Sequence, residues 1–138
     1  MFNVLAEINW LAVLVSVVAW SLIGGVYFGA VIAKPYAIAL GRENDAKSKP
    51  PAITFAGPMI TGVVMVVTSA VLMRALGVDA IGDAIAFGLI VGIGYLAAMT
   101  VTIAINPNFP RPLYYAALNA PGFVLSSVVV AIILGLWR

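Results

Sequence analysis

The chain has 138 residues, of which 64% are apolar and 9% are charged, and its formal net charge is +2. A soluble domain carries about 25% charged residues, so these few charges could not cover a surface that faces water. The sequence has no Cys and no His, which excludes disulfides, thiolate chemistry, the usual zinc sites and His-ligated haem. We therefore expect no cofactor.

All 12 charged side chains lie near the chain ends or in three connectors. They separate four uncharged, strongly apolar runs of 22 to 26 residues, and about 20 helical residues cross the hydrocarbon core of a bilayer. The sequence therefore predicts an all-α fold, a single membrane domain built as a four-helix transmembrane bundle. The predicted helices cover residues 8–33, 52–74, 84–105 and 113–137.

We expect the first run to be a retained helix and not a signal peptide. The residues before it include Glu7 but no Lys or Arg, and 26 residues exceed the apolar region of a signal peptide.

Local signals predict where these helices end. Pro35 disfavours the α conformation at Lys34, so the first helix is expected to break there. Gly77 is a candidate C-cap and Asp83 a candidate N-cap. Residues 106–112 have the composition of a turn. The pair Pro121-Gly122 predicts a kink in the last helix.

The distribution of Lys and Arg near the helix ends predicts the orientation in the membrane. The first and third connectors, on one side, carry five: Lys34, Arg42, Lys47, Lys49 and Arg111. The other side carries two, Arg74 and Arg138. This bias favours cytoplasmic first and third connectors, both termini outside, and location in the inner (cytoplasmic) membrane of a cell.

Three runs carry small residues at four-residue spacing, which lets helix backbones approach closely in lipid. These stripes are Ser21, Gly25, Gly29 and Ala33; Ala84, Gly88 and Gly92; and Ser127, Ala131 and Gly135. Packing within the chain is the main role we expect, and a homo-oligomer contact is the alternative. The second run has only Gly62 and Ala70, so we expect it to be the most peripheral.

Two halves of the sequence also resemble each other. Residues 21–30 resemble 88–97, residues 34–40 resemble 111–118, and residues 56–59 resemble 120–123, in the same order. This pattern predicts two helical hairpins related by a pseudo-twofold axis along the membrane normal.

No Asp, Glu, Lys, Arg or His lies in the middle of any run, which argues against a proton-driven pump. The uncharged polar and aromatic residues Trp20, Tyr27, Tyr95 and Asn119 are candidates for a pocket, with contacts between helices as the alternative. We expect Asn119 to satisfy a carbonyl that the kink at Pro121 frees.

Lys34 and Arg111 each precede a proline at the predicted cytoplasmic ends of the first and third helices. Basic residues near the cytoplasmic membrane surface attract anionic lipids. Topological anchoring explains both residues, and a shared site for a lipid phosphate headgroup is the more specific hypothesis.

Several short motifs together resemble a known family. Asn9-Trp10 opens the first helix, Gly25-Val-Tyr27-Phe28 is followed by Lys34-Pro-Tyr36 and Leu40-Gly41, Arg111-Pro112 precedes the last helix, and Leu136-Trp137 follows. This pattern resembles the small four-helix bacterial membrane proteins of domain-of-unknown-function family 1761. The resemblance implies four helices and a bacterial membrane but no activity. In relatives we expect a Tyr-His or similar pair where this chain has Pro121-Gly122.

We expect no enzyme activity, because no nucleophile–base pair can be assembled from these residues. The leading hypothesis is a small scaffold or accessory subunit in a homo- or hetero-oligomeric membrane complex. The alternative is an oligomeric channel or carrier for a small neutral or apolar solute. Expected partners are membrane lipids and copies of this chain or other membrane subunits, and not nucleic acid.

Overall fold

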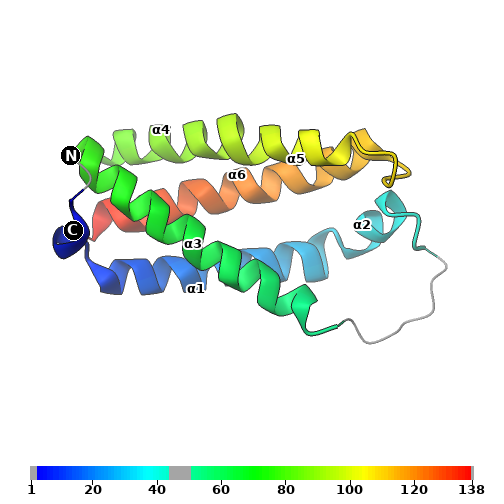
Figure 1. The fold of residues 1–138 in the computed structure, drawn as a ribbon, viewed down its shortest axis with the longest axis horizontal. Helices are drawn as coiled ribbons and strands as arrows, with labels where there is room; N and C mark the ends of the chain where they lie inside the picture. The colour runs from blue at the N-terminus through cyan, green and yellow to red at the C-terminus, as the bar shows by residue number, and fades with distance from the viewer. Residues whose placement is uncertain (1–2, 44–50, 138) are drawn as a thin grey trace.

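The computed structural model describes residues 3–43 and 51–137, and every regular element in this part of the chain is helical (Figure 1). In chain order the elements are η1 (Leu5–Glu7), α1 (Trp10–Val26), η2 (Tyr27–Val31), α2 (Ala33–Ala39), α3 (Ile53–Leu76), α4 (Ile81–Val91), η3 (Gly92–Ala97), α5 (Ala98–Ala104) and α6 (Pro112–Leu136). The all-α prediction is confirmed. Asp45, Lys47, Lys49 and Arg138, which entered the orientation prediction, lie outside the described residues.

Within the described residues, four continuous helical stretches are long and apolar enough to cross a membrane. Their mean hydropathy is 2.0 to 2.2, and the shortest has 22 residues. At about 1.5 Å per residue such a helix is about 33 Å long, which matches a hydrocarbon core of about 30 Å. The four spans are Trp10–Val31, Ile53–Leu76, Ile81–Ala104 and Pro112–Leu136.

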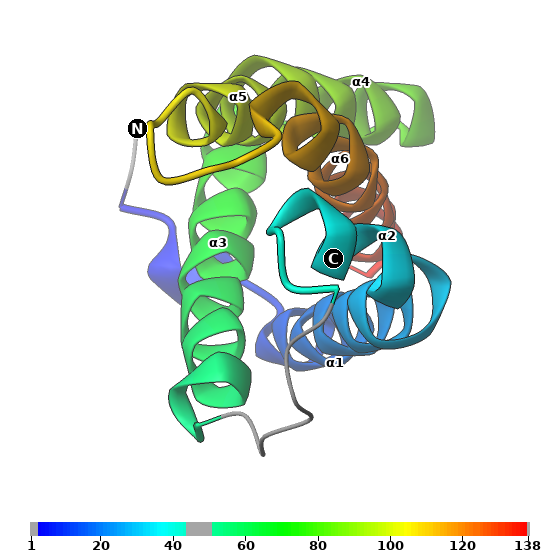
Figure 2. The same cartoon turned by 90° about the vertical axis from the view of Figure 1, so that its right-hand side faces the viewer.

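The central helix of the bundle is α6. It contacts α1, α2, α3 and all three parts of the span that runs from α4 through η3 to α5. In its most apolar window 33% of the residues are buried, compared with 22% in each of the other spans. Figure 2, an end-on view, shows the third span, α6 and α1 forming an arc, with α3 lying across its open side. The third span therefore packs along α6, whereas α3 rests on both α1 and α6.

The packed core lies in the half of the bundle nearest η1 and the end of α6. One cluster joins α1, α3 and α6 through Trp20, Val66 and Val130. A second cluster joins the end of α3 to α4 and α6 through Met73 and Phe87.

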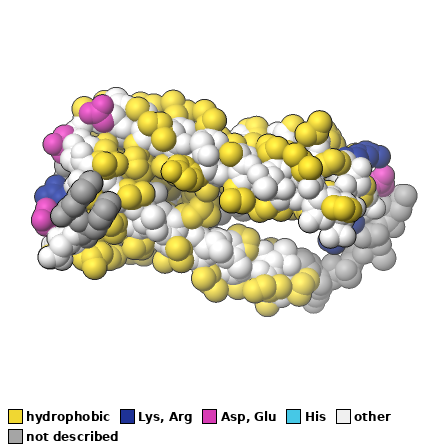
Figure 3. All heavy atoms as spheres, turned by 45° about the horizontal axis from the view of Figure 1, so that its top comes forward, with side chains coloured by type: hydrophobic (Ala, Val, Ile, Leu, Met, Phe, Trp, Pro, Cys, Tyr) yellow, Lys and Arg dark blue, Asp and Glu magenta, His cyan; other side chains and the backbone are white. Residues whose placement is uncertain are grey.

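In the opposite half the beginning of α3 stands apart from the other helices. Residues 53–61 are all exposed except Gly57, which is half-buried. In Figure 3 this part of α3, next to the grey segment, is separated from the rest of the bundle by a visible gap. The first two turns of α3, where Pro58 lies, therefore contribute little to packing within the chain.

The first and third spans share a departure from α geometry. Each contains a π-helical segment, η2 and η3, and in the first span the Ile32 N–H donates to the Tyr27 carbonyl at 2.9 Å, five residues back. These segments overlap the parts of the two spans that resemble each other in sequence. The contacts of the two halves nevertheless differ, because α1 packs along α6 while α3 has no comparable contact with α4. The pseudo-twofold axis stays a prediction.

The first span breaks earlier than predicted. The non-helical residue is Ile32, with φ −111° and ψ 10°, and Lys34 is already helical. Pro35 is the third residue of α2, where a backbone N–H has no acceptor within the helix. The missing N–H therefore costs nothing, and Lys34-Pro35 opens α2 instead of ending α1.

The two helix caps predicted between the second and third spans have different outcomes. Gly77 is the C-cap of α3 with φ +65°, a left-handed conformation that glycine adopts without a steric penalty. Asp83 is not an N-cap, because α4 begins at Ile81 after Ala80. Asp83 lies in the first turn, where its carboxylate interacts favourably with the helix dipole.

The last helix is continuous from Pro112 to Leu136, so Pro121-Gly122 does not divide it into two helices. Residues 106–111, by contrast, form the predicted turn, in which the Asn108 N–H donates to the side chain of Asn106 at 3.0 Å.

Candidate functional site

Two of the three small-residue stripes face each other inside the chain. A Cβ added to Gly88 would lie 2.7 Å from the Cα of Val128, and one added to Gly92 would lie 3.0 Å from the Cα of Val124. At the other end of this seam a Cβ on Gly135 would lie 2.9 Å from the Cβ of Ala84. The backbones of α4 and α6 are therefore close enough to require glycine, and we call this contact the α4–α6 seam. Ser127 and Ala131 lie on it, and both are buried.

Among the described residues, the stripe of the first span has no such neighbour. Gly25 and Gly29 are exposed, and a Cβ added to either would meet nothing within 4 Å among the described residues. Ser21 donates its hydroxyl to the Val17 carbonyl of its own helix, at 2.9 Å, and Ala33 is half-buried in α2. We call the surface around Gly25 and Gly29 the α1 glycine face.

A chain of aromatic rings connects α1, η2 and α2 to α6, a feature that the sequence pattern did not reveal. Successive ring centroids are 4.5 to 6.4 Å apart. The rings belong, in spatial order, to Trp20, Phe123, Phe28, Tyr36, Tyr115 and Phe109. Trp20 also lies on Gly62 of α3, where an added Cβ would be 2.5 Å from the indole ring.

Tyr27 is the residue through which η2 contacts the proline region of α6. Its ring covers Gly122, where an added Cβ would be 2.7 Å from two ring carbons. Its hydroxyl donates to the Leu118 carbonyl at 2.9 Å. The π-helical segment thus places a donor beside the turn of α6 that Pro121 weakens.

Asn119 does not have the role that we expected. Pro121 has no N–H to offer the Ala117 carbonyl, but the Asn119 amide donates to the Tyr115 carbonyl at 2.7 Å. Asn119 is buried on α6, whereas Tyr95 is 71% exposed. The structure therefore brings Trp20, Tyr27 and Asn119 to the face of α6 that meets α1 and η2 and leaves Tyr95 on the outer surface.

The two predicted lipid-headgroup residues lie at the same end of the bundle, at the starts of α2 and α6 (Figure 1). Arg111 pairs with Glu43 at 3.8 Å, and both side chains are about half exposed. Lys34 is exposed in α2. Nearby, burial and then the interaction with Tyr115 raise the pKa of Tyr36 above its usual range, so this phenol stays neutral. The end therefore combines the exposed cations Lys34, Arg42 and Arg111 with an aromatic cluster.

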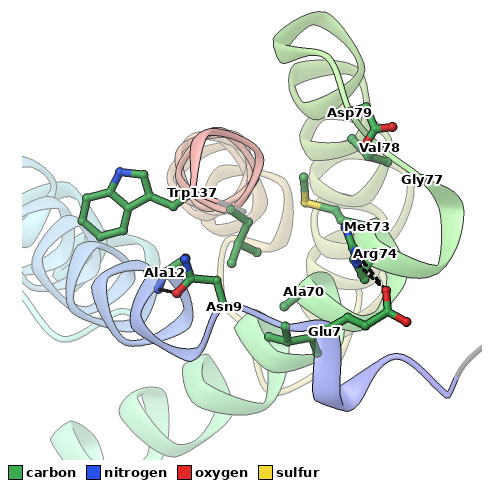
Figure 4. Close-up of a pocket in the computed structure, with 12 residues that line it drawn as sticks. Glu7, Asn9, Ala12, Ala70, Met73, Arg74, Gly77, Val78, Asp79 and Trp137 are labelled. Atoms are coloured by element: carbon green, nitrogen blue, oxygen red, sulfur yellow. Dashed lines mark hydrogen bonds and ion pairs between the residues drawn. The ribbon is translucent and has the colours of Figure 1, made fainter.

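A small cavity of about 50 Å³ lies at the opposite end, between the start of α1 and the ends of α3 and α6 (Figure 4). Its polar wall is an ion pair in which Arg74 Nε and Nη2 lie 3.0 and 2.8 Å from the same oxygen of Glu7. Asn9 caps α1 beside it by accepting from the N–H groups of Leu11 and Ala12. The ion pair joins the residues before α1 to the end of α3, and no cluster of metal-binding side chains occurs among the described residues.

A larger cavity of about 150 Å³ lies inside the arc of helices, and we call it the mid-span cavity. Trp20, Met65, Leu96 and Ser127 are among its lining residues, so all four spans contribute. Of the predicted pocket residues only Trp20 lines it.

Three spans around a fourth, α6, with no charged residue at mid-depth, define a helical membrane bundle. The family is shown by sequence: residues 11–135 match the family described as "Protein of unknown function (DUF1761)", and the chain belongs to it. Neither the curated proteins nor the solved structures include a match. The predicted resemblance is confirmed, and the family description assigns no activity.

Proposed function

We propose that the protein is a small scaffold or accessory subunit, without enzyme activity of its own, that packs against a neighbouring membrane helix through the α1 glycine face. The observation that supports this proposal is that two pairs of glycines at the same four-residue spacing have different surroundings. The glycines of the α4–α6 seam are filled by a partner helix, whereas Gly25 and Gly29 face open space within the described residues.

The physical reason is that association in lipid depends on close backbone approach. Apolar side chains gain little from meeting each other when the solvent is also apolar. A groove over two glycines lets another helix approach closely enough for dispersion and weak Cα–H···O contacts. The neighbour is a second copy of the chain or a different membrane subunit.

The lack of native cysteines permits a direct test of the α1 glycine face. When native membranes are oxidised mildly, a single Gly25→Cys substitution should give a disulfide-linked dimer, or a mixed disulfide where a partner subunit has a cysteine at the contact. The matched control is Gly94→Cys, because Gly94 also lies on an exposed helix surface with nothing within 4 Å.

A pull-down in mild detergent gives the second measurement. The tagged chain should recover its partner, Gly25→Leu combined with Gly29→Leu should lose it, and Gly94→Leu should retain it. Recovery of free monomer alone from the unmodified chain would contradict the proposal.

The proposed location is the inner membrane, with the first and third connectors in the cytoplasm and both termini outside. The Lys and Arg distribution supports this orientation. Reporter fusions to the C-terminus that are active only inside or only outside the cell measure it, and an active cytoplasmic reporter would reverse it.

The mid-span cavity favours a second candidate function, an oligomeric channel or carrier for a small neutral or apolar solute. Four helices rarely enclose a complete pore, so transport would require several copies. Native mass spectrometry that finds a defined homo-oligomer, together with flux into liposomes, supports this candidate. A hetero-complex without flux supports the scaffold.

A further inference from the structure

The mid-span cavity lies near the middle of the apolar layer. Its lining residue on α1, Trp20, is close to the midpoint of the span Trp10–Val31. Leu96 in η3 and Ser127 on α6 lie within a turn of the midpoints of their own spans. The surroundings of this cavity are therefore hydrocarbon and not water.

Hydroxyl groups divide into two sets that differ in their hydrogen bonding. Nine Ser and Thr side chains lie within the spans beyond the first helical turn. Five donate to a carbonyl of their own helix, as is usual in lipid: Ser21, Thr61, Thr100, Thr102 and Ser126.

The other four make no hydrogen bond with any described residue, and three of them line the mid-span cavity. These three are Thr68, Ser69 and Ser127, and the fourth, Ser16, is fully buried. A hydroxyl in hydrocarbon that does not bond to its own helix loses stabilisation that was available to it. Three such groups on one cavity therefore indicate that the cavity receives a polar group.

Ser127 is the most informative of these hydroxyls. It is 7% exposed, so lipid hardly reaches it except through the cavity. It belongs to the α4–α6 seam, whose backbones are held close together by Gly88 and Gly92. The adjacent residue Ser126 is slightly more buried but donates to the Gly122 carbonyl at 2.9 Å. The two neighbours thus form a matched pair of one satisfied and one unsatisfied hydroxyl.

The remaining walls define what kind of molecule fits. They are apolar, and no charged side chain is among the described residues that line the cavity. A dry protein cavity of about 150 Å³ accommodates a molecule of the size of benzene. Val64 at the cavity is 60% exposed, so a longer apolar chain has a way out toward lipid beside α3.

We propose that the mid-span cavity binds a small uncharged amphiphile, a lipid-soluble alcohol or carbonyl compound, whose oxygen lies beside Ser127 and whose apolar body lies against α3 and η3. The site is complete within one chain, so it does not depend on association through the α1 glycine face.

The test uses Trp20 as a fluorescent reporter. Phe replaces the half-exposed Trp10 and Trp137, which leaves Trp20 as the only tryptophan. The protein in lipid nanodiscs is titrated with an undecanol that carries a terminal bromine, and in parallel with bromoundecane, which lacks the oxygen. We expect saturable quenching, with half-saturation by the alcohol at an about fivefold lower concentration, as one hydrogen bond would give.

Matched variants connect this preference to one hydroxyl. Ser127→Ala should abolish the preference for the alcohol, and Ser126→Ala should keep it. Ser69→Leu, which fills the cavity, should abolish saturation. Quenching that rises without saturation, that is equal for both probes, or that Ser127→Ala leaves unchanged would overturn the proposal. Gly25→Leu combined with Gly29→Leu should still bind, which separates this proposal from that of the scaffold.

Discussion

The α4–α6 seam and the α1 glycine face carry the same sequence motif but differ in structure. In the seam, glycine is required because an added Cβ at Gly88 would lie 2.7 Å from a backbone atom. On the α1 glycine face an added Cβ at Gly25 or Gly29 meets nothing within 4 Å of the described chain. Small residues at four-residue spacing therefore show that a helix is able to pack closely. They do not show which helix is its partner.

The largest effect that we expect comes from the seam. Gly88→Ala should destabilise the fold by about 3 kcal/mol, because the backbone of Val128 cannot yield as a flexible side chain does. Equilibrium unfolding in mixed micelles with increasing SDS measures this loss. Gly94→Ala is the control, and equal unfolding curves for the two variants would remove the distinction between the seam and an open surface.

A smaller loss is expected where a glycine meets a side chain. Gly122→Ala should cost about 1.5 kcal/mol, because the ring of Tyr27 covers Gly122 but is able to shift. The same substitution in a Tyr27→Ala background should cost less, and a double-mutant cycle measures the difference. Additive effects of the two substitutions would show that the ring does not occupy the position described.

On the α1 glycine face a Gly→Ala substitution should stabilise the fold instead of destabilising it. Gly25→Ala should stabilise the monomer by about 0.7 kcal/mol, because alanine has the higher helix propensity and no neighbour opposes its methyl group. SDS unfolding at a dilution where copies do not associate measures this gain. A loss as large as that at Gly88 would mean that the face is covered within the chain after all.

The smallest effect should come from the ion pair at the end of the bundle. Arg74→Gln removes the 2.8 Å contact with Glu7 and should cost less than about 0.5 kcal/mol, because both side chains are roughly half exposed and well solvated. The same unfolding measurement tests this, with Arg111→Gln as the comparison for the longer 3.8 Å pair. A loss above 1 kcal/mol would indicate that the pair is shielded by lipid.

Local chemistry predicted some boundaries and misplaced others. Gly77 ends α3 as expected, because few residues other than glycine adopt its φ of +65° at low cost. The helix positions predicted for Asp83 and Lys34-Pro35 were wrong, because each of these local signals is compatible with more than one position in a helix. A carboxylate stabilises a helix from the cap or from the first turn, and a proline is tolerated anywhere in that turn.

The candidate site was predicted less well than the fold. Trp20 was named as a pocket residue and lines the mid-span cavity, but Tyr95, named with it, is 71% exposed. Thr68, Ser69 and Ser127 could not be separated by sequence from the six other hydroxyls inside the spans. What separates them is that each lacks a hydrogen bond and also lines the cavity, and both properties depend on how the four spans pack.

The amino-acid sequence was sufficient to predict four helices long and apolar enough to cross a membrane. The thickness of the bilayer sets the length of apolar run that is needed, and its polarity sets where charges are tolerated. Only the packing of the helices shows that α6 contacts all three other spans, that the stripes of the third and fourth spans face each other, and that the α1 glycine face is open among the described residues. In lipid every helix exterior is apolar, so hydrophobicity does not determine which helices pack against each other. Steric fit between particular residues determines it.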